Sequence, residues 1–189
     1  MEPAPGVPLL MRTSWPRNLA LLATLLFGAG MASVGRADLS EDQAKVSLIY
    51  NLTKFVQWPQ TPPDRTLNLC VYRDDTITPT LASLRDKASK GLALRVQSAD
   101  STEESRNCQV LFIGRGEQAN LRPLVRALRG SGILVISDIP DSARAGAMVE
   151  VFLDNKRIAF KINKAAADEA NLKLSSQLLS LAKAIYDSY

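Results

Sequence analysis

The sequence predicts an α/β fold: a three-layer sandwich with a mostly parallel central sheet, a C-terminal antiparallel hairpin, and helices on both faces. Three observations lead to this prediction. Segments typical of strands alternate with amphipathic helical segments over most of the chain. Two strand segments, 108–113 and 132–137, are almost wholly apolar, as in strands that are covered on both faces. Two further strand segments, 148–153 and 157–162, are separated by a turn and predict the hairpin.

Residues 1–37 have the composition of a secretory signal peptide. Two arginines precede the apolar run Leu19–Phe27, and small residues then lead to a cleavage site expected after Ala37. The run is too short to span a bilayer, although an uncleaved N-terminal anchor is the alternative. The protein is therefore expected in the periplasm, with residues 38–189 as a single domain that does not insert into the membrane after cleavage.

The first helix is predicted to begin after Ser40 and to end at Trp58. Its apolar residues recur at steps of three and four, which is typical of a helix with one buried face. They are Ala44, Leu48, Ile49, Leu52, Phe55 and Val56. Ser40 and Gln43 have the spacing of a capping box, and Pro59 disfavours helical geometry at the preceding Trp58.

The remaining elements follow from the same two periodicities. Strands are predicted at 67–72, 92–97, 108–113, 132–137, 148–153 and 157–162. Helices are predicted at 79–90, 117–129, 163–170 and 174–187, with Gly91 ending the first of these four. The polar segment 98–107 is predicted as a loop, and Asp154–Asn155 as the hairpin turn.

The composition argues against several classes of function. Histidine is absent, which removes the commonest general base and every His-containing metal site. Without residues 1–37, the 23 basic and 19 acidic residues become 20 and 18, so half of the net charge of +4 belongs to the predicted signal peptide. Arg122, Arg126 and Arg129 are interleaved with leucines, as on a solvated helix face, so nucleic-acid binding is not expected. The sequence predicts no catalytic residue, no metal site and no cofactor.

Cys70 and Cys108 are the two cysteines of the chain. An even number of cysteines in an oxidising compartment favours a disulfide. Such a bridge would stabilise the fold by about 4 kcal/mol in the chain-entropy treatment. The bridge is either structural or redox-responsive, and two free thiols are the remaining alternative. No C-x-x-C spacing occurs, so a thioredoxin-like oxidoreductase is not expected.

The loop 114–119 is a candidate ligand-binding site. It follows a predicted strand, opens a predicted helix and fits the pattern G-x-G-x-x-A, and Asp138 lies at the end of the next strand. Gly114 and Gly116 would bring backbone N–H groups onto an anion or a phosphate, with the Asp138 carboxylate on a ribose. Against this, Glu117 places a negative charge where the phosphate would sit, so an ordinary glycine turn is the alternative.

Two further groups of side chains have open interpretations. Tyr50 and Asn51 form a polar pair near Trp58, and a tryptophan at a helix end either packs into the core or anchors a partner. These three residues are therefore candidate partner-binding residues. Asp138 with Asp141 is either an acid–base or cation-binding pair or part of an ordinary turn.

Several segments of the chain resemble a known family. The run from Lys45 to Pro59, which contains Tyr50-Asn51 and Trp58, is similar to the opening signature of the YfiR family of bacterial periplasmic regulators. The resemblance extends from 42 to 187 through Leu69–Val71, Asn107–Ile113, Leu134–Asp138, Phe160–Asn163, Ala165–Ala166, Leu172–Leu179 and Leu181–Ala182.

The resemblance implies a non-enzymatic inhibitor. Members of the family bind the periplasmic sensory domain of an inner-membrane diguanylate cyclase and hold it inactive, which lowers cyclic di-GMP signalling and affects biofilm formation. An outer-membrane lipoprotein can sequester them. The resemblance therefore implies these two partners. The alternative is a periplasmic small-ligand-binding protein for an anion or a nucleotide-like molecule, serving a different sensor.

The resemblance also implies a homodimer and a disulfide that responds to reducing conditions. Cys70 and Cys108 match one cysteine pair of the family. The second bridge of some members, in the later hairpin, has no counterpart, and the segment 145–147 reads Ala-Gly-Ala where the family often has Gly-Gly. The missing bridge weakens the expectation of redox sensing more than the expectation of the fold.

Overall fold

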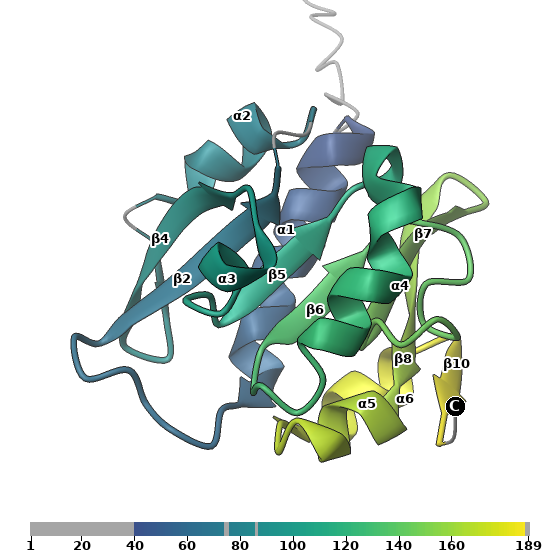
Figure 1. The fold of residues 1–189 in the computed structure, drawn as a ribbon. Helices are drawn as coiled ribbons and strands as arrows, with labels where there is room; N and C mark the ends of the chain where they lie inside the picture. Colours follow the sequence, from purple (N-terminus) through teal and green to yellow (C-terminus); the bar gives the residue numbers. More distant parts are fainter. Residues whose placement is uncertain (1–39, 74–75, 86, 188–189) are drawn as a thin grey trace, which may run out of the picture. The chain divides into compact units, whose positions relative to one another are not determined.

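The computed structural model describes residues 40–73, 76–85 and 87–187, and the predicted signal peptide lies outside this part. Its helices are α1 Glu41–Phe55, α2 Thr78–Leu81, α3 Thr102–Ser105, α4 Gln118–Ala127, α5 Lys164–Glu169 and α6 Ser176–Leu181, with 3-10 turns η1 Ala82–Leu84 and η2 Arg115–Glu117. Its strands are β1 Val56–Gln57, β2 Thr66–Tyr72, β3 Ala88–Ser89, β4 Leu92–Ala99, β5 Val110–Ile113, β6 Leu134–Ser137, β7 Val149–Asp154, β8 Arg157–Asn163, β9 Lys173–Leu174 and β10 Ala184–Tyr186 (Figure 1).

Among the described residues, eight strands form one sheet in the order β10-β8-β7-β6-β5-β2-β4-β3. Pairing is parallel from β4 through β2, β5 and β6 to β7, and antiparallel in the hairpin β7–β8. β2 lies between β4 and β5, so the order in which the chain adds strands reverses at β2. The predicted α/β class, with a mostly parallel sheet and a C-terminal hairpin, is confirmed.

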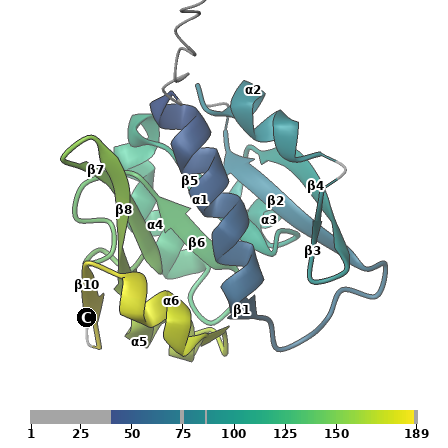
Figure 2. The ribbon, with the colours of Figure 1, turned by 180° about the vertical axis from the view of Figure 1, so that it is seen from behind.

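Helices cover both faces of this sheet. Because successive side chains of a strand point to opposite faces, β2 contributes to two apolar clusters. Leu69 and Val71 belong to a cluster with residues of α1, whereas Cys70 and Tyr72 belong to a cluster with residues of α4. Figure 1 shows α3 and α4 on one face, and Figure 2 shows α1, α2 and α6 on the other. The predicted three-layer sandwich is therefore confirmed.

Helix α1 begins as predicted but ends earlier. The Ser40 hydroxyl accepts a hydrogen bond from the Gln43 backbone N–H at 3.2 Å, and Gln43 Oε1 accepts one from the Ser40 N–H at 3.0 Å, which completes the capping box. The helix ends at Phe55, because Val56 leaves helical geometry and pairs with Leu174 of β9. The extension to Trp58 is wrong because this pairing joins residues far apart in the sequence.

The helix predicted at 79–90 is wrong beyond Leu84. Ala88–Ser89 form β3, which pairs antiparallel with β4 around a turn at Lys90 and Gly91. Both turn residues have positive φ, 53° and 76°, so Gly91 closes a hairpin rather than a helix. Residues 88–89 pair with β4 rather than continue a helix, because the backbone N–H and C=O groups at the start of β4 would otherwise lack partners at the edge of the sheet.

The helix predicted at 174–187 is wrong beyond Leu181. Residues Ala184–Tyr186 form β10, which adds to the sheet parallel to β8, and the Lys183 N–H donates to the Phe160 carbonyl at 2.9 Å. Two smaller differences lie elsewhere. The loop predicted at 98–107 contains the single turn α3, and the hairpin turn falls one residue later than predicted, at 155–156, where both residues have positive φ.

Candidate functional site

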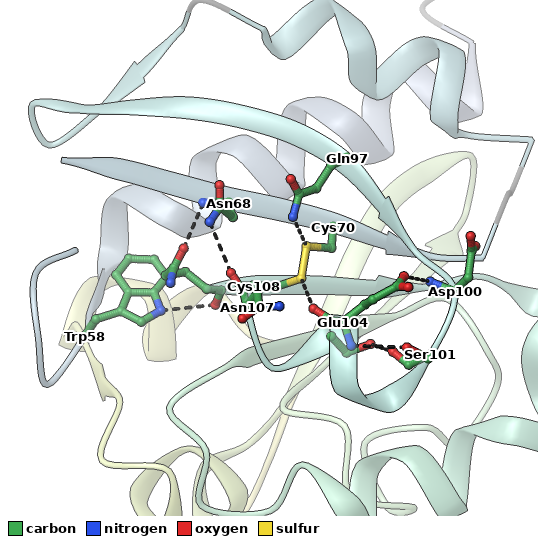
Figure 3. The surroundings of a disulfide bond; sticks show 11 residues. Trp58, Asn68, Cys70, Gln97, Asp100, Ser101, Glu104, Asn107 and Cys108 are labelled. Carbon is green, nitrogen blue, oxygen red and sulfur yellow. Dashed lines mark hydrogen bonds between the residues drawn. A yellow bond between two sulfur atoms is a disulfide. The ribbon is translucent and has the colours of Figure 1, made fainter. Parts of the chain in front are cut away.

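The structure joins Cys70 and Cys108 in a disulfide beneath α3 (Figure 3). Their Cα atoms are 5.9 Å apart, and both residues are buried, one within β2 and the other just before β5. Gln97 Nε2 lies 3.5 Å from Cys70 Sγ, and the Glu104 carbonyl oxygen lies 3.7 Å from Cys108 Sγ. The bridge thus ties neighbouring strands together inside the core, where access of a reducing thiol is limited.

Trp58 packs partly into the core, and its indole N–H has an internal partner. Nε1 donates to the Gln109 carbonyl at 3.1 Å, and the ring is half-buried against the cluster that contains α1. The Gln109 side chain in turn accepts from the Asn68 backbone N–H at 2.9 Å, while Asn68 Nδ2 donates to the Asn107 carbonyl at 3.1 Å (Figure 3). This network fixes Trp58 to the segment that carries Cys108.

Tyr50 belongs to a line of contacts between α1 and β3 that we call the α1–β3 seam. The Tyr50 hydroxyl donates to the Ala88 carbonyl at 2.8 Å, and one turn later the Thr53 hydroxyl donates to Ser89 Oγ at 2.8 Å. A further turn along, Lys90 Nζ donates to the carbonyl of Val56 at 3.0 Å. The seam holds the edge strand β3 against α1, so the polar end of Tyr50 has a structural partner.

Asn51 lies on the exposed side of α1, next to Tyr50. Its Oδ1 accepts from Lys54 Nζ at 3.2 Å, and Lys54 Nζ also lies 3.9 Å from the centre of the Tyr50 ring. Tyr50 and Asn51 line the same hollow of about 330 Å³ between α1 and the α2–η1 segment. Trp58 lines a different hollow of about 380 Å³. The structure therefore brings Tyr50 and Asn51 together and places Trp58 at another surface depression.

The candidate ligand loop begins with the 3-10 turn η2. Gly114 is buried, whereas Gly116 is exposed, and a Cβ added to Gly116 would meet no atom within 4 Å. Glu117 lies 3.5 Å from the Arg73 guanidinium and accepts a hydrogen bond from Asn120. The loop thus follows β5 at its carboxyl end, beside the end of β2, where doubly wound sheets commonly bind ligands.

Asp138 forms a buried ion pair that sequence reasoning did not identify. Its Oδ2 lies 2.7 Å from Lys45 Nζ, and both side chains are 7% exposed. Arg115 Nε lies 3.5 Å from the same oxygen and donates to the Asp138 carbonyl at 3.2 Å. Lys45 also contacts Glu41 at 2.9 Å. Asp138 Oδ1 is buried and has no hydrogen-bond partner among the described residues.

The sequence of α1 contained an indication of this ion pair. Lys45 lies four residues before Ile49 and seven before Leu52, on the spacing of the buried face, where a charged side chain requires a partner. Burial alone would lower the pKa of Lys45, but the Asp138 and Glu41 carboxylates raise its pKa above the ordinary value of 10.5. The hydrogen bond and the charge of Lys45 lower the pKa of Glu41 below 4.5.

A second polar network holds the loop between β6 and β7. The Glu150 carboxylate is buried, contacts Lys161 Nζ at 2.8 Å and accepts from the Ala143 N–H at 3.2 Å. Asn163 Nδ2 donates to the Ala143 carbonyl at 2.7 Å. Asp141 is exposed in this loop, whereas Asp138 is buried at its start, so the two carboxylates lie in different environments.

In the part of the chain that the structure describes, no group of three or more cysteine, aspartate or glutamate side chains is arranged to hold a metal ion. The helices of that part are too short or too polar to cross a membrane.

Comparison with known families then identifies the chain. The sequence model of the YfiR/HmsC-like family matches residues 42–183, from the first turns of α1 to just before β10. This chain belongs to the YfiR/HmsC-like family. The YfiR/HmsC-like proteins are periplasmic regulators of diguanylate cyclase signalling and are not known as enzymes.

Two solved structures share the fold of this YfiR/HmsC-like protein at low sequence identity. One is a conserved domain protein from Vibrio cholerae, with a TM-score of 0.56 and 14% identity over 78% of this chain and 61% of that chain. The other is the ABC domain from Streptococcus pneumonia in complex with L-Trp, with a TM-score of 0.50 and 13% identity over 76% and 60%. The chain spans about three fifths of the length of either structure, and at this identity the similarity concerns the fold alone.

The single disulfide of the described residues uses both cysteines of the chain. No cysteine remains for the second bridge that the resemblance implies for some members, because both cysteines are in the Cys70–Cys108 bond. The segment near Gly146, which precedes the hairpin, is held by the contacts of Ala143 with Glu150 and Asn163. A Cβ at Gly146, where φ is 110°, would lie 2.7 Å from Val125 Cγ1, so only glycine packs there without a shift.

Proposed function

We propose that this protein binds the periplasmic sensory domain of an inner-membrane diguanylate cyclase and holds the cyclase inactive. The observation that carries the proposal is the match to the YfiR/HmsC-like family over residues 42–183, which covers both layers of helices and most of the sheet rather than one motif. A regulator of this kind acts by contact, and its site is a surface. Tyr50, Asn51 and Trp58 all line surface depressions, which is compatible with that role.

The proposal includes export and assembly. Residues 1–37 act as a signal peptide that is cleaved after Ala37, so the folded chain reaches the periplasm, where the Cys70–Cys108 bond can form. The folded chain acts as a homodimer, and an outer-membrane lipoprotein sequesters it and releases the cyclase. These steps rest on the family resemblance and on the order of charged, apolar and small residues before Ala37.

The first test measures cyclic di-GMP in cells with and without this protein. Deletion is expected to raise cyclic di-GMP, and the exported form is expected to restore the low level, whereas a form without residues 1–37 is not. Cross-linking followed by purification is expected to recover a membrane cyclase. Unchanged cyclic di-GMP on deletion, with no cyclase recovered, would contradict the proposal.

A second candidate function, binding of an anion or a nucleotide-like molecule, is favoured by one observation. Asp138 Oδ1 is buried without a partner among the described residues, next to the loop of Gly114 and Gly116 at the carboxyl ends of the parallel strands. Against it, Asp138 Oδ2 already pairs with Lys45. A thermal-shift screen of nucleotides and small anions tests it, because a ligand that binds only the folded state raises the melting temperature. No shift with any of them would contradict it.

A further inference from the structure

Two lysines meet at the ring of Tyr50, which lines the hollow between α1 and the α2–η1 segment. We call this hollow the lysine groove, and it is lined by Ser47 and Asn51 of α1, by Ser83 of η1, by Lys87 and by the ring of Tyr50. Its volume is about 330 Å³. Lys54 extends from α1 to the same ring, and the two ammonium groups lie 3.9 Å and 5.7 Å from the ring centre.

Lys87 lines the groove, and Lys54 lies beside it at the Tyr50 ring; neither forms an ion pair with a carboxylate of the described residues. Lys54 donates to the amide oxygen of Asn51, and Lys87 faces the Tyr50 ring. By contrast, Lys45 and Lys161 each contact a carboxylate at 2.9 Å or less. Two exposed cations around one aromatic ring repel each other and attract an anion that can interact with both.

The walls of the groove can bind the residues that flank an acidic side chain in a peptide. Ser47 and Asn51 lie one turn apart on α1, and Ser83 belongs to the facing wall. All three are exposed, so their polar groups are open to an incoming chain. Val46 and Leu84 form an apolar floor. A charged rim, hydrogen-bonding walls and an apolar floor together suit a peptide segment.

A protein segment fits this surface better than a membrane does. Surface helices that bind lipid combine basic residues with exposed large apolar side chains. The exposed large aliphatic side chains of the described residues are Leu153, Leu181 and Ile185, and none of them lines the groove. A concave site with serine and asparagine walls also offers little to a flat layer of head groups.

We infer that the lysine groove holds an acidic segment of the partner protein, with an aspartate or glutamate side chain between Lys54 and Lys87. The inference rests on the proposed function, because it names the surface through which the regulator contacts the cyclase. It leaves Tyr50 in its place in the α1–β3 seam, because the hydroxyl keeps its hydrogen bond to the Ala88 carbonyl.

The test compares two charge reversals in exported protein. K54E/K87E reverses the groove, and R122E/R126E reverses two exposed arginines of α4, on the other face of the sheet, as a matched control. In a deletion strain, wild type and the α4 control are expected to lower cyclic di-GMP. K54E/K87E is expected to leave it at the deletion level and to recover roughly tenfold less cyclase on cross-linking, as for loss of complementary charge contacts.

Folding is checked with the purified proteins, whose melting temperatures and circular dichroism are expected to agree. A third variant, K54Q/K87Q, removes the charges without placing a negative group at the C-terminal end of α1, and an intermediate loss is expected. Repression by K54E/K87E equal to that of wild type would overturn the inference, and so would equal loss in the α4 control.

Binding to vesicles of phosphatidylcholine and phosphatidylglycerol distinguishes a membrane surface from a protein as the partner of the groove. No binding by wild type is expected, and binding that K54E/K87E abolishes would overturn the inference in favour of a lipid surface. If wild type itself fails to lower cyclic di-GMP, the proposed function fails. That outcome differs from the one in which wild type represses and the groove variants repress equally well.

Discussion

Lys45 occupies a position on the buried face of α1 where a hydrocarbon side chain would normally pack. Its ammonium group is retained there because Asp138 and Glu41 both contact it. Removing one partner of a buried pair leaves the other charge without compensation, which costs more than the pair contributes to stability. The position of Asp138 at the end of β6 therefore depends on α1.

Lys45→Met is expected to lower the free energy of unfolding by about 3 kcal/mol, because the Asp138 carboxylate loses its nearest cation. Urea denaturation measures this change. Lys54→Met, on the exposed side of the same helix, is the control and is expected to change stability by less than about 0.5 kcal/mol. A loss no larger than in the control would show that Arg115 alone compensates Asp138.

The same contacts predict how stability depends on pH. The carboxylate partners raise the pKa of Lys45 above 10.5, and the hydrogen bond that Lys161 donates to Glu150 raises the pKa of Lys161 above 10.5. A lysine whose pKa is higher in the folded than in the unfolded protein stabilises the folded state at every pH below its unfolded pKa. This stabilisation is lost as the pH rises through the pKa that the lysine has in the folded state. Melting temperature is therefore expected to fall above pH 10.5, and to fall less steeply in Lys45→Met. Equal slopes in the two proteins would contradict the role of Lys45.

At the scale of elements, the ends of helices and the edges of the sheet were the least predictable parts. The capping residues of α1 marked its start correctly, because a capping box is a local interaction. The end of α1 depends on the pairing of β1 with β9, and β10 depends on pairing with β8; both partners are distant in the sequence. The strand β3 depends on pairing with β4 across a turn. Of the candidate site, Cys70 and Cys108 were predicted as a pair, whereas Lys45 was missed as the partner of Asp138.

The disulfide links β2 to the segment just before β5 and joins cysteines that are 38 positions apart in the sequence. Replacing both cysteines, Cys70→Ala with Cys108→Ala, is expected to lower stability by about 4 kcal/mol under oxidising conditions. Thermal denaturation with and without reductant checks this, since reduced wild type is expected to approach the double variant. An unchanged melting temperature in the oxidised double variant would rule out a structural role for the bridge.

Trp58 attaches the end of α1 to the segment before β5. Trp58→Phe keeps most of the ring but removes the N–H that donates to the Gln109 carbonyl, so a loss of about 1 kcal/mol is expected. Repression of cyclic di-GMP, corrected for the amount of folded protein, is expected to stay at the wild-type level. A loss of repression without a loss of stability would instead make Trp58 a partner anchor.

At the scale of the whole molecule, the C-terminal segment completes the sheet. β10 covers part of β8, which would otherwise be an open edge strand beside β7 and its exposed Leu153. The hydrogen bond from the Lys183 N–H to the Phe160 carbonyl begins this pairing. β10 is thus the outermost strand at this side of the sheet, and the part of β8 that pairs with it is closed to other chains.

Lys183→Pro removes that N–H and is expected to lower stability by about 1 kcal/mol. It is also expected to increase self-association through β8, which light scattering after size-exclusion chromatography measures. Lys183→Ala keeps the N–H and removes the contact with Asp154, so it serves as the control for the side chain. The same oligomeric state in both variants and in wild type would show that β10 does not protect the edge.

The sequence by itself determined the alternation of helices and strands, the central buried strands, the start of α1 and the family, because each depends on local periodicity or on motifs spread along the chain. Only the tertiary structure decided the partner of Lys45, the seam between α1 and β3, and the strands β1, β3 and β10 at the margins of the sheets. These features depend on which backbone and charged groups lack a partner once the core has formed, because buried polar groups must be paired across the fold.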